Sequence, residues 1–140
     1  MTAEVPQRGV RLHRQAVRAA FLATAIAAFG TALRLLASWD PTQLTLLGGP
    51  VLLFAYSMAL RRREGWTRSL GVAVGYGTPV GVGVMFFQLL SHGFPTTAVP
   101  LIQHLVIAPA LAVCGVVAAR RLGSAEVREL FDPRSTARGP

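Results

Sequence analysis

Four long runs of apolar residues, separated by short polar segments, dominate the hydropathy pattern of the chain. The runs cover residues 16–37, 44–60, 69–90 and 99–119. Apolar runs of about 17–25 residues are long enough to cross the hydrocarbon core of a membrane as helices. The pattern therefore predicts an all-α integral membrane protein, a bundle of four transmembrane helices occupying residues 16–121.

The polar segments mark the turns and the ends of this bundle. We expect residues 1–15 to form a basic juxtamembrane segment that lies in the inner headgroup layer before the chain turns into the membrane. Outer turns are expected at residues 38–42, where Trp39 suits the interface, and at residues 91–97. Residues 61–68 form the inner loop between the second and third spans.

The segment after the fourth span, residues 122–140, contains a short amphipathic pattern. Ser124 suits a helix N-cap, and Val127, Leu130 and Phe131 give an apolar stripe with helical spacing. A short helix is therefore predicted over residues 124–131. It would lie on the inner leaflet, pack beneath the bundle or dock a partner.

Arginine predicts the orientation of the bundle. Thirteen of the fourteen arginines lie before or at the start of the first run, between the second and third, or after the fourth, and the chain has no lysine. Basic residues in short segments mark the cytoplasmic side, so both termini are predicted to lie inside. We expect the arginines beside the spans to contact anionic lipid headgroups, namely Arg11, Arg14, Arg18, Arg61, Arg62, Arg63, Arg120 and Arg121.

Composition supports the membrane class and narrows the others. Only 14% of residues are charged, against about 25% in soluble domains. The net charge of +8 is explained by orientation, since no basic stretch is long enough to bind nucleic acid. Use of arginine alone is typical of a GC-rich genome, which favours a bacterial inner membrane. The single cysteine, Cys114, excludes an internal disulfide.

The third span carries a glycine pattern typical of helix packing. Gly71 and Gly75 share one helical face with Thr78 beside them, and Gly77 and Gly81 form a second pair. Missing side chains let another backbone approach closely, which holds helices together in lipid. The partner is either another helix of the same bundle or a second protein.

Two prolines and four polar side chains lie near or within the last two spans. Pro79 and Pro109 each remove a helical hydrogen bond and predict kinks, which free the carbonyls of Gly75 and Leu105. Polar residues at membrane depth either bond between helices or line a cavity, here one open to the outside. The residues concerned are Gln88, His92, Gln103 and His104.

No carboxylate lies within a span, and the chain has no nucleophile motif, phosphate loop or metal-ligand spacing. We therefore expect neither an enzyme nor a resident cofactor. The leading hypothesis is an accessory or scaffold subunit of an inner-membrane complex, bound to another membrane protein or to itself. One alternative is a small uncoupled oligomeric channel or carrier. A further alternative is a haem-holding redox subunit with His92 and His104 as ligands.

Overall fold

The computed structural model describes residues 4–37 and 47–131, and all the regular structure in these ranges is helical. This confirms the all-α prediction for the described part of the chain, which holds no strand. The outer turn expected at residues 38–42 lies outside it, as do the tail beyond residue 131 and the start of the second predicted span. The elements are α1 (Glu4–Ala37), α2 (Gly48–Arg61), α3 (Gly65–His92), α4 (Ala98–Ile102), η2 (Gln103–Ile107), α5 (Ala108–Leu122) and α6 (Ala125–Leu130).

Three stretches are long and apolar enough to cross a membrane: Gln7–Ala37 in α1, Gly65–His92 in α3, and Ala98–Leu122, which joins α4, η2 and α5. Large apolar side chains on them face outward, as membrane-embedded helices require; Phe87 is 70% exposed. These features indicate a membrane protein. The second predicted span, residues 44–60, corresponds to α2, whose 14 residues extend over only about 21 Å.

Helix α1 differs from the expected arrangement of the N-terminal segment. We expected residues 1–15 to lie in the headgroup layer before a turn, but α1 runs without a break from Glu4 to Ala37. Its 34 residues extend over about 51 Å, well beyond the roughly 30 Å of a hydrocarbon core. The basic segment is therefore the projecting end of the first helix.

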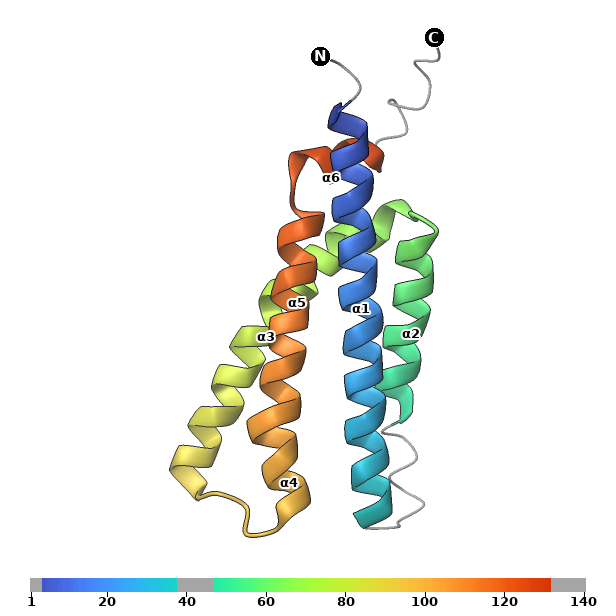
Figure 1. Ribbon diagram of the computed structural model, residues 1–140. Coiled ribbons are helices and arrows are strands. Elements are labelled where there is room, and N and C mark those ends of the chain that lie inside the picture. Colours follow the sequence, from blue (N-terminus) through green and yellow to red (C-terminus); the bar gives the residue numbers. More distant parts are fainter. Residues whose placement is uncertain (1–3, 38–46, 132–140) are drawn as a thin grey trace.

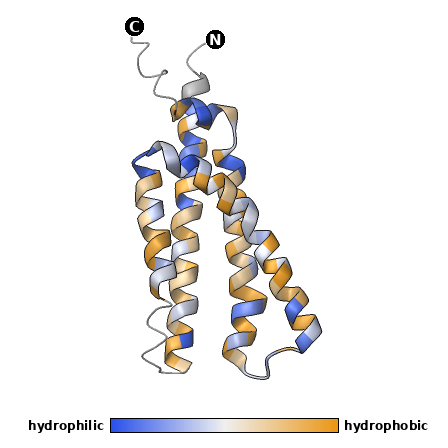
Figure 2. Ribbon diagram, turned by 180° about the vertical axis from the view of Figure 1, so that it is seen from behind, coloured by the Kyte–Doolittle hydropathy of each residue, from blue (hydrophilic) through white to orange (hydrophobic). Residues whose placement is uncertain are grey.

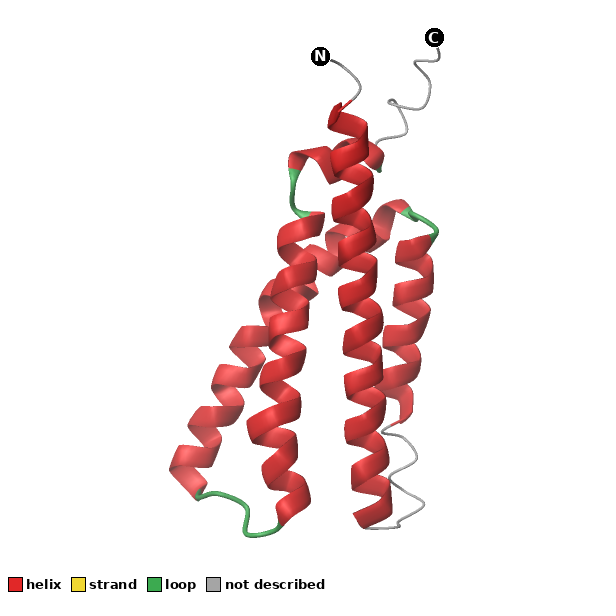
Figure 3. Ribbon diagram, viewed as in Figure 1, coloured by secondary structure: helices red, strands yellow, loops and turns green. Residues whose placement is uncertain are grey.

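The long helices pack in the order α3, α5, α1, α2, and the bundle is not closed (Figure 1). Extensive contacts join α3 to α5, α5 to α1, and α1 to α2, whereas α2 and α3 share few. Helix α3 starts near α2 and slants away from it, so the two are farthest apart where α3 ends (Figures 1 and 3). Helices α2 and α3 therefore pack poorly against each other, although they are adjacent in the sequence.

The tightest packing lies at one end of the bundle, where α1 begins, α2 connects to α3, and α5 connects to α6. We call this the α6 end; Figure 2 shows hydrophilic segments gathered there. A cluster of fully or almost fully buried side chains joins α1, α2, α5 and α6 at this end. Its members are Ala16, Ala20, Leu60, Leu122 and Val127.

Candidate functional site

The predicted glycine face is divided between two environments in the structure. Gly71 and Gly75 are buried where α3 crosses α5. A methyl group on Gly75 would collide with the backbone carbonyl of Gly115 and lie 2.7 Å from Cβ of Ala119. Gly71, Gly75 and Gly115 therefore allow α3 and α5 to approach closely within one chain. Gly115 was not identified from the sequence, although a glycine in an apolar span was the available signal.

Gly77 and Gly81 face away from this crossing. Both are exposed, and a methyl group added to either would meet no atom of the described residues within 4 Å. This second glycine pair therefore has room for a helix that the described chain does not supply.

Each proline is accommodated in a different way. Pro79 lies inside α3, and the carbonyl of Gly75 that it frees accepts a 2.9 Å hydrogen bond from Oγ1 of Thr78. Pro109 follows η2, a turn of π-helix in which the N–H of Ala108 donates to the carbonyl of Gln103. The wider turn lets the helix continue into the proline, since π-turns occur as local insertions in α-helices.

A hollow of about 470 Å³ lies between α1 and α4–η2, at the end opposite α6. Arg34, Gln103 and His104 line it together with residues 97–100. Nε2 of Gln103 donates a 3.1 Å hydrogen bond to the carbonyl of Gly30, so this side chain ties η2 to α1 as well. Gly30 itself is pressed against Ile107, which allows this approach.

The four predicted polar residues do not form one cluster. Gln88 and His92 are exposed on the last turns of α3 and do not line this hollow. Both imidazoles hydrogen-bond within their own helix: Nδ1 of His92 donates to the carbonyl of Gln88, and Nδ1 of His104 donates to that of Pro100. Residues 4–37 and 47–131 bring no three His, Cys, Asp or Glu side chains together as metal ligands.

A second hollow, of about 460 Å³, lies among α1, α2, α3 and α5, and its lining is almost wholly apolar. Each of these helices contributes to the lining, for example through Ala23, Leu53, Val74 and Leu111 in that order. On its rim Leu52 is 72% exposed and Val74 51% exposed, so the hollow opens sideways where α2 and α3 separate. We call it the α2/α3 groove.

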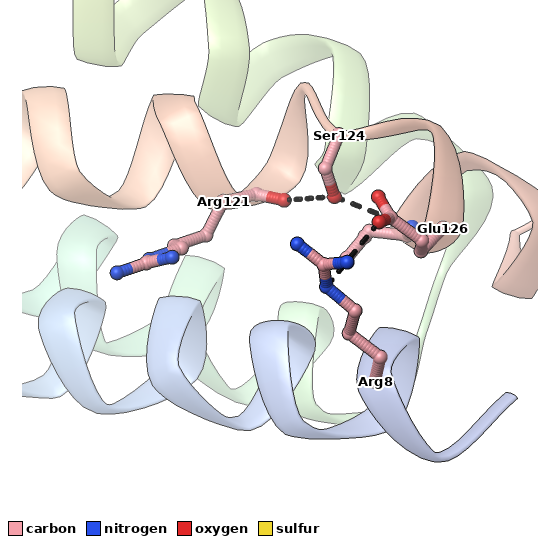
Figure 4. Close-up of polar contacts among 5 residues, drawn as sticks. Arg8, Arg121, Ser124 and Glu126 are labelled. Atoms are coloured by element: carbon pink, nitrogen blue, oxygen red, sulfur yellow. Dashed lines mark hydrogen bonds and ion pairs between the residues drawn. The ribbon is translucent and has the colours of Figure 1, made fainter. Parts of the chain in front are cut away.

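Helix α6 packs against the projecting part of α1. The sequence had left three positions open for this short helix: on the inner leaflet, beneath the bundle or against a partner. Ser124 caps α6 by accepting a hydrogen bond from the N–H of Val127, and its hydroxyl donates to the carbonyl of Arg121 (Figure 4). Arg8 and Glu126 form a 3.5 Å ion pair between the helices, shown in the same view. A methyl group on Gly9 would lie 2.7 Å from the carbonyl oxygen of Glu126.

His13 is a buried polar residue of this junction that sequence reasoning missed. Its Nε2 donates a 3.0 Å hydrogen bond to the carbonyl of Leu60 at the end of α2, and its ring meets that of Phe131 edge-on. His13 therefore links α1, α2 and the end of α6. His13 lies between arginines that are exposed, so the sequence pattern gave no sign that this side chain is buried.

The arginines predicted to contact headgroups are all exposed at the α6 end. They are Arg11, Arg14 and Arg18 on α1, Arg61, Arg62 and Arg63 at the α2–α3 connection, and Arg120 and Arg121 on α5. Arg68 has a structural role, since its Nε donates to the carbonyl of Leu122. Trp66 is half-exposed beside the connection and packs edge-on against Tyr56.

Comparison with known proteins finds no matching family, no similar curated protein and no similar solved structure.

Proposed function

We propose that the chain is a small non-catalytic membrane protein, an accessory or scaffold subunit of a complex in a bacterial inner membrane. It crosses the membrane four times, with α2 as the second span and both termini on the cytoplasmic side. Support for this orientation comes from the exposed arginines gathered at the α6 end, as basic residues favour the cytoplasmic side.

The observation that carries the proposed role is the open glycine pair Gly77 and Gly81 on α3. Small residues on a lipid-facing helix give another helix close backbone contact, which is a main source of helix association in membranes. The other glycine pair of α3 is already used by α5. The outward pair therefore offers a surface for a helix of a different protein.

Substitution of Gly81 by Leu tests this role. We expect Gly81→Leu to remove a stoichiometric partner from the complex isolated in mild detergent and measured by native mass spectrometry. Gly83→Leu is the matched control, because Gly83 is equally open but lies about 200° around the same helix from Gly81. Retention of the partner by both variants would contradict the role. So would the absence of any partner from the unmodified chain.

Membrane orientation is tested separately. Cys114 is replaced by Ala, and single cysteines are placed at Arg62 and at Thr96 for labelling in intact cells with a reagent that does not cross the membrane. We expect labelling at position 96 only. Labelling at position 62 would exclude the four-span, both-termini-inside arrangement.

The alternative function is a small uncoupled oligomeric channel or carrier, and the hollow lined by Arg34, Gln103 and His104 favours it. In that case His104→Ala changes solute flux into liposomes while leaving assembly intact. A homo-oligomer without a foreign subunit, together with such a flux change, would favour this alternative over the scaffold.

A further inference from the structure

We infer that the α2/α3 groove is a binding site for one anionic phospholipid, with an acyl chain in the groove and the headgroup at the α2–α3 connection. This inference does not rest on the scaffold role, since neither Gly77 nor Gly81 lines the groove. It requires only that the helices lie in a membrane.

The shape and lining of the groove suit an acyl chain. Its volume of about 460 Å³ lies within the range of small-molecule sites. Alanine and glycine residues, including Ala19, Ala23 and Gly115, leave the interior open, and leucines of α2 and α3 flank it. An apolar groove that opens sideways in a membrane faces lipid chains, which enter it without exposing apolar surface to water.

The groove is closed toward the α6 end by a polar tie between its two outer walls. The hydroxyl of Tyr56 donates a 3.0 Å hydrogen bond to the carbonyl of Thr67, and the same hydroxyl packs against Gly71. A chain lying in the groove therefore ends below Tyr56, and the rest of the lipid passes beside Trp66.

The charge beyond this closure is complementary to an anionic headgroup. Arg61 ends the last turn of α2, about 7–8 Å farther along the axis than Tyr56, and Arg62 and Arg63 follow it directly. Trp66 fixes the level of the interface, where tryptophan is enriched, and its Nε1 donates to Glu64. Thus the apolar site lies at chain depth, and the cationic segment lies beyond its closed end.

Charge complementarity also decides against a helix from another protein as the occupant. An apolar transmembrane helix would gain nothing from three consecutive arginines beyond one end of the groove, whereas an anionic headgroup is attracted by each of them. The open glycine pair offers a helix an unoccupied position farther along α3.

Native mass spectrometry of the full chain tests the site, with added dioleoyl phosphatidylglycerol or dioleoyl phosphatidylcholine after delipidation in mild detergent. We expect one retained phosphatidylglycerol per chain, bound more tightly than phosphatidylcholine. Arg61→Gln/Arg62→Gln is expected to weaken phosphatidylglycerol binding about thirty-fold, since each arginine near an anionic group contributes a factor of about five. The control Arg120→Gln/Arg121→Gln removes the same charge at the end of α5.

Ala23→Phe tests the acyl-chain half of the site, because the ring fills the groove. Its control, Ala25→Phe, places the same ring on the exposed side of α1. We expect loss of both lipids with Ala23→Phe and retention with Ala25→Phe, with circular dichroism verifying the fold of each. Should Ala23→Phe not fold, the comparison of the two arginine pairs decides.

Three outcomes overturn the inference. The first is the absence of retained lipid on the unmodified chain, and the second is equal binding by the two arginine pairs. The third is the finding that a protein subunit occupies the groove instead of lipid and is displaced by Ala23→Phe. Loss of a partner through Gly81→Leu leaves the lipid result unchanged, so the two proposals fail separately.

Discussion

At the scale of single residues, glycines decide how closely the helices approach, and identical residues have opposite roles. Gly9 and Gly75 each face a backbone carbonyl of another helix, whereas Gly77 and Gly81 face open space within the described structure. Sequence spacing identified both pairs on α3 as packing candidates. It gave no means of deciding which pair contacts the chain's own α5.

Alanine at these glycines has opposite expected effects. Gly75→Ala places a methyl group against the carbonyl of Gly115, and overpacking of this kind costs about 1–3 kcal/mol. Gly77→Ala meets open space and gains up to about 1 kcal/mol from helix propensity. Thermal unfolding in detergent should show a lower Tm for the first and an equal or higher Tm for the second. Similar Tm values for both variants would contradict the α3–α5 crossing.

At the scale of elements, α6 and the projecting end of α1 form a second layer of packing beyond the bundle. Val127 is fully buried there, and His13 joins the same junction to the end of α2. Arg8 is exposed, so its ion pair with the partly buried Glu126 contributes little in water, and apolar contact is the main stabilising term.

The docking of α6 is tested by aspartate at two positions of the same helix. Val127→Asp buries an unpaired carboxylate, which is strongly unfavourable, so α6 should separate from α1. Ala125→Asp lies at an exposed position in the first turn, where the helix dipole favours negative charge. Hydrogen–deuterium exchange of residues 7–14 should rise for Val127→Asp alone. An equal rise for both variants would show that α6 is not held by Val127.

At the scale of the whole molecule, packing and charge are concentrated at one end. The fully buried side chains, including Leu60 and Leu122, lie at the α6 end, and so do the exposed arginines of the three basic segments. Toward the other end α3 separates from α2 (Figure 1). The molecule thus has a tightly packed, basic end and a looser apolar body.

This asymmetry predicts how the chain responds to moved charge. In one variant Arg61, Arg62 and Arg63 are replaced by Ser, and three arginines are inserted after Gly93. Because basic loops set orientation, α3 and the helix after it should cross the membrane in the opposite direction in part of the molecules. Cysteine labelling at position 96 should then fall, while arginines inserted after Gly123 should leave it unchanged. Unchanged labelling in both variants would mean that the arginine distribution does not orient the chain.

The sequence by itself determined the helical class, the membrane-compatible lengths and the amphipathic turn after the fourth apolar run. Hydropathy, caps and prolines act within a few residues of the chain, so local pattern is sufficient to predict them. The cap formed by Ser124 and the hydrogen bond that re-satisfies Gly75 are of this local kind. Four membrane crossings and their orientation remain predictions from the same pattern.

Only the tertiary structure decided which faces meet: α3 on α5, α6 on α1, and an open groove between α2 and α3. It also joined the basic segment to the first span as one helix and separated Gln88 and His92 from the hollow beside His104. The physical reason is that lipid-facing and buried surfaces of membrane helices are both apolar, so hydropathy does not distinguish them. Close packing between segments distant in the sequence makes that choice.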